Sequence, residues 1–119
     1  MINKIEIQKE QALNAIKNGE FDKSITTSKE IVLIILTQDW CPQWQALKTW
    51  LYDSTDVKAD IDVYELVYNT TDYFEEFKTF KEEQLGNSEI PYLRFYRNGA
   101  LIEETNYISK DRFTEIIGQ

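Results

Sequence analysis

The residue of this chain best suited to chemistry is its single cysteine, Cys41. Six aliphatic residues precede it at 31–36, a pattern typical of a strand buried on both faces. Pro42 follows it and suits the first turn of a helix, and apolar residues then recur at helical spacing through 42–52. The sequence therefore predicts that Cys41 lies at a helix N-terminus, in the turn after a central strand.

That position would favour a reactive thiol. The first turn of a helix offers unpaired N–H groups and a partial positive charge, both of which stabilise a thiolate. The thiolate is the nucleophilic form of cysteine, and turns after central strands are where α/β folds expose working groups. We therefore expect Cys41 to be solvent-accessible. Two points oppose this interpretation: a lone cysteine is commonly a small buried apolar residue, and the carboxylate of nearby Asp39 disfavours a thiolate.

Two motifs resemble the signatures of the thioredoxin family. The segment Trp40-Cys41-Pro42-Gln43-Trp44 is similar to its active-site turn, Trp-Cys-x-x-Cys, and the stretch 90–99 is similar to the segment in which a cis-proline precedes a strand ending in a glycine turn. The resemblance covers nearly the whole chain. It implies a cis Ile90–Pro91 bond, with Cys41 as the catalytic thiol. It also implies one substrate-binding surface around that thiol, made of Trp40, Pro42, Ile90, Pro91 and Tyr92.

The chain also departs from that family. Trp44 replaces the second cysteine, Ile35 stands where the family carries a buried acid, and Glu65 stands where it usually has lysine. A dithiol reductase uses its second cysteine to resolve the mixed disulfide formed by the first. Cys41 could carry out the first step, but resolution would need an outside thiol such as glutathione.

The patterns along the rest of the chain predict an α/β fold. The order βαβαββα, with parallel units first and an antiparallel hairpin last, predicts a central mixed sheet with helices on both faces, as in the thioredoxin family. We expect residues 1–119 to form a single domain. The expected strands are 2–7, 31–37, 61–68, 92–97 and 100–105, and the expected helices are 8–18, 42–52, 72–84 and one beginning after Ser109, with a helical turn in the loop 20–30.

Composition narrows the classes of partner and cofactor. Asp and Glu number 21 against 13 Lys and Arg, so the net charge of −8 disfavours nucleic acids and anionic membranes. One cysteine and no histidine exclude an internal disulfide and make a metal site improbable. We expect no cofactor. No apolar run approaches the roughly 18 residues of a membrane span, and no signal peptide is visible, so a cytoplasmic monomer is expected.

Two functions of different classes fit these observations, and whether the chain is an enzyme stays open. The first is a thioredoxin-like monothiol protein whose Cys41 forms mixed disulfides with a protein or small-thiol partner. The second is a redox-inactive module that binds peptides in a groove around Trp40 and Pro91, with the backbone of Ile90 pairing to an extended segment. We expect Trp44 in the core, whereas Trp40 fits either a core or an anchor role. Retention of Trp-Cys-Pro favours the first function.

Overall fold

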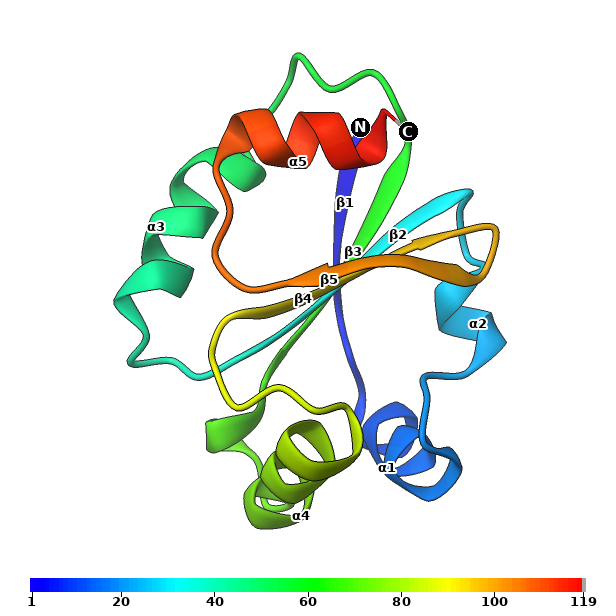
Figure 1. The fold of residues 1–119 in the computed structure, drawn as a ribbon, viewed down its shortest axis with the longest axis vertical. Helices are drawn as coiled ribbons and strands as arrows, with labels where there is room; N and C mark the ends of the chain where they lie inside the picture. The colour runs from blue at the N-terminus through cyan, green and yellow to red at the C-terminus, as the bar shows by residue number, and fades with distance from the viewer. Residues whose placement is uncertain (119) are drawn as a thin grey trace.

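In the computed structural model, which describes residues 1–118, five strands form one mixed sheet in the order β1-β3-β2-β4-β5 (Figure 1). From β2 to α5 the elements follow the predicted order βαβαββα, and β1, α1 and α2 precede them. The strands are β1 Ile2–Glu6, β2 Ile31–Thr37, β3 Ile61–Val67, β4 Tyr92–Arg97 and β5 Ala100–Thr105. The helices are α1 Lys9–Asn18, α2 Lys23–Thr26, α3 Pro42–Leu51, α4 Phe74–Thr79 and α5 Lys110–Ile117, with a 3₁₀ turn at Tyr68–Thr70 and a π-helical segment at Phe80–Gln84.

The central strand is β2, and its predicted burial is confirmed, because all seven of its residues are buried. It pairs in parallel with β3 and antiparallel with β4. The strands β1 and β5 form the two edges of the sheet. The turn that carries Cys41 therefore leaves the sheet at the carboxyl end of its innermost strand.

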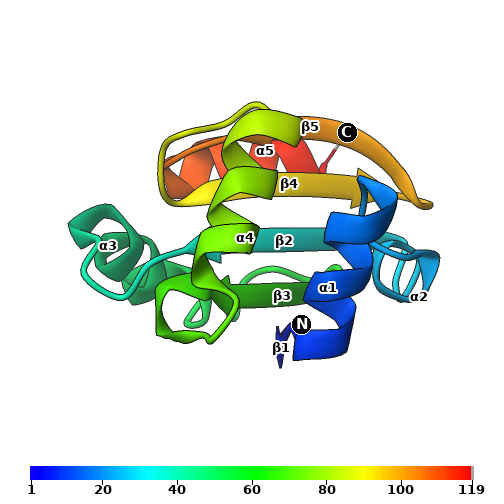
Figure 2. The same cartoon turned by 90° about the horizontal axis from the view of Figure 1, so that it is seen from below.

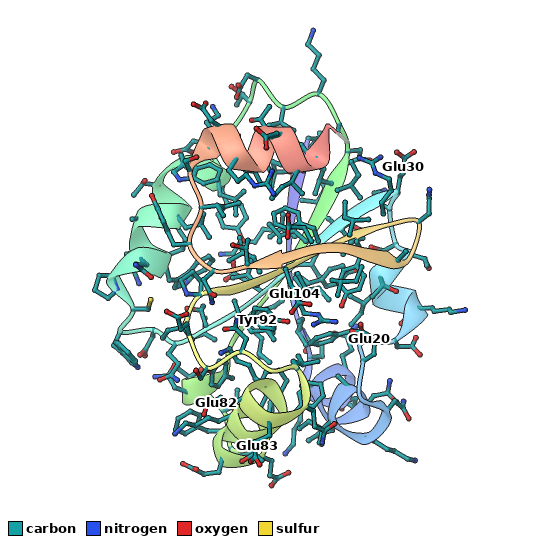
Figure 3. The ribbon with its side chains drawn as sticks, viewed as in Figure 1. Glu20, Glu30, Glu82, Glu83, Tyr92 and Glu104 are labelled. Carbon is teal, nitrogen blue, oxygen red and sulfur yellow. The ribbon has the colours of Figure 1, made fainter. Side chains whose placement is uncertain are left out.

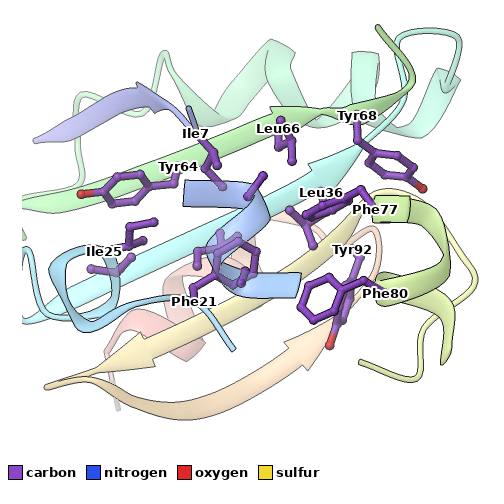
Figure 4. Close-up of a cluster of buried hydrophobic side chains, with 14 of the residues drawn as sticks. Ile7, Phe21, Ile25, Leu36, Tyr64, Leu66, Tyr68, Phe77, Phe80 and Tyr92 are labelled. Atoms are coloured by element: carbon purple, nitrogen blue, oxygen red, sulfur yellow. The ribbon is translucent and has the colours of Figure 1, made fainter. Parts of the chain in front are cut away.

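The helices cover both faces of the sheet. Figure 2 shows α1 and α4 crossing one face, and α3 and α5 lie on the other. On the α1 and α4 side, Phe77 and Phe80 pack beside Tyr68 and Tyr92 in a core that mixes aromatic and aliphatic residues (Figure 4). The sequence predicted a continuous helix over 72–84, but the regular α-helix ends at Thr79 and continues as a wider π-helical turn.

The hairpin between β4 and β5 turns at Asn98 and Gly99, as the sequence predicted. Both residues have positive φ, 52° and 82°, which the Asn-Gly pair tolerates better than other residues. A Cβ at Gly99 would lie 2.8 Å from Cγ2 of Thr27 on the loop before β2.

We expect Gly99→Ala to lower the free energy of unfolding by about 2 kcal/mol, because it adds both backbone strain and a steric clash. Gly86→Ala is the matched control, since Gly86 has a φ of 75° but open space around its Cβ position. It should cost about 1 kcal/mol. Urea unfolding of both variants measures the difference, and equal losses would contradict the clash with Thr27.

Among the described residues, no helix combines the length and the apolar character that crossing a membrane requires.

Candidate functional site

The turn after β2 has the predicted geometry. Cys41 is the N-cap residue of α3, and Pro42 occupies its first turn. The Cys41 N–H donates to the carbonyl oxygen of Gln38 (3.3 Å), and the Gln45 N–H donates to the Cys41 carbonyl (3.2 Å). The thiol therefore lies at the positive end of a ten-residue helix.

The expectation of a solvent-accessible Cys41 is wrong for this conformation. The residue is only 3% exposed and belongs to the apolar cluster on the α3 and α5 side, together with Trp44 and Leu93. Its Sγ lies 3.6 Å from the carbonyl oxygen of Ile90 and donates a hydrogen bond to it. The segment before β4, which comes from a distant part of the chain, therefore contributes to this burial.

That segment carries the second predicted motif. The Ile90–Pro91 peptide bond is cis. Ile90 is half-buried and packs against the apolar clusters on both faces of the sheet, while Pro91 is buried. The two predicted motifs therefore meet, with the Ile90 carbonyl and the Cys41 thiol in contact.

Tyr92 does not line a surface that a partner could reach. Its side chain is fully buried on the α1 and α4 side, and its hydroxyl donates to Oε1 of Glu104 at 2.5 Å. Arg94 donates to the same hydroxyl at 2.7 Å. Tyr92 is the first residue of β4, and the alternation of side chains along the strand turns it into the core. The prediction that Tyr92 binds substrate directly is therefore corrected: its buried side chain supports the loop that leads into β4.

The exposed part of the site consists of Trp40 and Pro42, with the half-buried Ile90 beside Cys41. Trp40 is 64% exposed, and its Nε1 donates to Oε1 of Gln38 at 2.5 Å. This large aromatic surface next to the Cys41 turn favours the anchor role for Trp40. Trp44, in contrast, is 1% exposed, which confirms its predicted place in the core.

Asn69, which the sequence did not single out as a site residue, fixes the Cys41 turn through its bonds to Asp39. The N–H of Asp39 donates to Oδ1 of Asn69 at 3.0 Å, and Nδ2 of Asn69 donates to Oδ1 of Asp39 at 2.8 Å. Asn69 lies in the 3₁₀ turn after β3. This two-way bond ties the ends of neighbouring parallel strands together and holds Trp40 and Cys41 at that end of the sheet.

Two of the three departures from the thioredoxin pattern, Ile35 and Glu65, lie side by side in the sheet. Ile35 is fully buried and is paired in register with Glu65 on β3. Glu65 accepts a hydrogen bond from the hydroxyl of Tyr52 and lies 3.8 Å from Nζ of Lys4. Burial and this carboxylate together raise the pKa of Tyr52 far above its usual range. The carboxylate is thus engaged by Tyr52, directly after α3, and by Lys4 on β1. Ile35, on the strand that leads to Cys41, has an aliphatic side chain that cannot transfer a proton.

Among residues 1–118, no three acidic or cysteine side chains are grouped in a way that could hold a metal ion.

Comparisons with known proteins show the fold. No family model matches the sequence, and no curated protein matches it. Thioredoxin O2 from Arabidopsis thaliana is a similar solved structure, with a TM-score of 0.69 and 14% identity, covering 98% of this chain and 93% of that one. A mutant thioredoxin from Halobacterium salinarum gives a TM-score of 0.66 and 17% identity over 97% of this chain and 88% of its own. Thioredoxin F from spinach chloroplast, in its short form, gives a TM-score of 0.60 and 15% identity over 98% of this chain and 90% of its own. The chain therefore has the thioredoxin fold.

Proposed function

We propose that this chain is a thioredoxin-like monothiol protein that joins a partner through a mixed disulfide at Cys41. The observation that carries the proposal is the contact between Sγ of Cys41 and the carbonyl oxygen of Ile90, at 3.6 Å. An extended partner segment that paired with the Ile90 backbone by strand addition would bring its own sulfur to Cys41. Trp40 would anchor that segment from the exposed side.

The reaction is a thiol–disulfide exchange. The thiolate of Cys41 attacks one sulfur of a partner disulfide, and the partner's S–S bond breaks as the new one forms. The other partner sulfur leaves as a thiolate with the electron pair of the broken bond. Because Trp44 replaces a resolving cysteine, a second thiol from outside, of the glutathione type, must release the product and regenerate Cys41.

The burial of Cys41 makes this reaction depend on a local movement. The thiol must leave the Ile90 carbonyl before it can attack, because in this conformation it is buried and its proton is donated to that carbonyl. Loops can open locally at a lower free-energy cost than global unfolding. The proposal therefore needs the loop before β4, or the Trp40 turn, to open while the sheet stays intact.

Glutathione disulfide provides the direct test. The native chain incubated with it at pH 7 should gain one glutathione adduct in its intact mass, and dithiothreitol should remove that adduct. Cys41→Ser is the control and should gain none. Absence of an adduct on the native wild-type chain, with an adduct formed readily in denaturant, would count against the monothiol function.

The burial of Cys41 specifically favours a second candidate, the redox-inactive peptide-binding module. In that case Cys41→Ser would leave partner binding unchanged, since the thiol would serve only in packing. A peptide library with extended apolar segments, screened against the Cys41→Ser chain and against a Trp40→Ala chain, separates the two functions. Binding that survives the first change and is lost with the second supports the module.

A further inference from the structure

The most unusual charged group in the molecule is Lys81, a lysine with 0% exposure. It lies in the π-helical segment Phe80–Gln84, and such widened turns occur frequently at functional sites. Its Nζ donates to the carbonyl oxygens of Asn87 (2.8 Å) and Glu89 (2.7 Å), and it lies 5.5 Å from the centre of the Tyr92 ring. These three contacts are all with uncharged groups, so the ammonium is buried against neutral acceptors, which is an expensive arrangement.

The acceptors belong to the loop that leads into Ile90 and Pro91. Within this loop, residues 87–91, Oδ1 of Asn87 accepts from the N–H of Glu89 at 3.0 Å. Asn106 bonds the side chain of Asn87 and also donates to the Pro91 carbonyl oxygen at 2.9 Å. Lys81 thus supplies two of the bonds that place the Ile90 carbonyl against the Cys41 thiol.

Burial and the neighbouring carboxylates have opposing effects on the pKa of Lys81. Burial lowers the pKa of Lys81 to about 8, although the carboxylates of Glu82, on its own helical segment, and Glu89, on the loop, partly oppose that shift. Tyr92, on β4, has its pKa raised to about 12 by burial and by its bond to Glu104, so it stays neutral. Figure 3 shows Tyr92 pointing toward Glu104, with Glu82 on the neighbouring helix. A solvated lysine has a pKa near 10.4.

We propose that Lys81 is a positioning residue that makes the loop 87–91 a gate over Cys41: the two bonds that its Nζ donates to the loop hold the Ile90 carbonyl on the thiol, and the loop opens when a charged Lys81 leaves this buried position for water. Opening exposes together the backbone of Ile90 and the thiol of Cys41, the two groups that a partner needs. That a partner reacts with Cys41 through the open gate rests on the proposed monothiol function. The opening of the loop does not rest on it.

The direction of the pH dependence follows from linkage. The open loop, with a solvated lysine, binds its proton more tightly than the closed loop does. Between the two pKa values, lowering the pH therefore favours the open loop, and raising the pH favours the closed one. With a closed-state pKa of about 8, the open population should fall about tenfold between pH 7 and pH 9.

Pulsed hydrogen exchange of the segment 85–92, read by mass spectrometry, measures that population once rates are divided by the intrinsic amide rates at each pH. The expected result is about tenfold greater protection at pH 9 than at pH 7, with the Lys81 ¹³Cε signal titrating near pH 8. Lys81→Met should abolish the pH dependence. Lys78→Met, on α4 and half-buried, should retain it. If Lys81→Met does not fold, the two wild-type titrations still decide the matter.

Protection that is independent of pH, or a Lys81 signal that titrates near its solvated value, would overturn the gate. The rate of glutathione adduct formation on Cys41 tests the monothiol function separately from the gate. If wild-type Cys41 never forms an adduct but loop protection changes with pH as described, the gate stands and the monothiol function falls. If wild-type Cys41 reacts while the protection stays constant, the gate falls and the monothiol function stands.

Discussion

Replacing Trp44 with alanine is expected to lower the free energy of unfolding by about 4 kcal/mol. A buried tryptophan truncated to alanine costs about 3–5 kcal/mol through lost apolar burial and the cavity left behind. Trp44 is 1% exposed in the cluster on the α3 and α5 side, where Lys48 also lies 5.3 Å from its ring centre. Because small domains are stable by about 5–15 kcal/mol, this loss would remove a large fraction of the stability of the fold.

Trp40→Ala is the matched control for this prediction. The same chemical change at a residue that is 64% exposed should alter the free energy of unfolding by less than about 0.5 kcal/mol. Urea unfolding followed by circular dichroism measures both variants. Similar losses of unfolding free energy in the two variants would contradict the assignment of Trp40 to the exposed surface and of Trp44 to the core.

Replacing Arg94 with methionine should lower the free energy of unfolding by about 3 kcal/mol. The Arg94 side chain is 5% exposed and lies on the α1 and α4 face of β4. It donates to the hydroxyls of Tyr92 and Tyr96 and to Oε2 of Glu20 at 2.6 Å. Methionine would fill much of the volume but leave the two buried tyrosine hydroxyls, and the partly exposed carboxylate of Glu20, without their cationic donor.

Arg97→Met provides the comparison for Arg94. Arg97 lies at the end of the same strand and pairs with the largely exposed Glu30. Because solvent screens such a pair, its loss should cost only about 1 kcal/mol. Equal losses in the two variants, measured in the same denaturant series, would contradict a structural role for the buried network.

Local signals in the sequence were sufficient for most of the fold. The aliphatic run of β2 defined a buried strand with the correct bounds at 31–37, and the Asn98-Gly99 pair located the hairpin. Ser109 caps α5 as expected, since its side chain accepts from the N–H of Arg112. These features depend on residues within a few positions of one another, which is why sequence patterns predict them well.

The parts that the sequence could not predict depend on distant contacts. Cys41 is buried in the core on the α3 and α5 side, where Ile90, 49 positions away, places its carbonyl against the thiol. Lys81 falls within the helix predicted over 72–84, but it is buried in a π-helical turn where its Nζ donates to loop carbonyls. Neither the wider turn nor the loop conformation has a signal in the neighbouring residues.

The central claim is that Cys41 becomes reactive through local opening of a folded chain, and its alkylation rate at low urea tests this most directly. Iodoacetamide at pH 7 should modify Cys41 at a rate that stays constant as urea rises, until the unfolding transition begins. Such independence means that the reactive state exposes little surface beyond the site itself. A rate that instead rises with urea in proportion to the globally unfolded fraction would contradict the account, because Cys41 would then be a core residue without access to any partner.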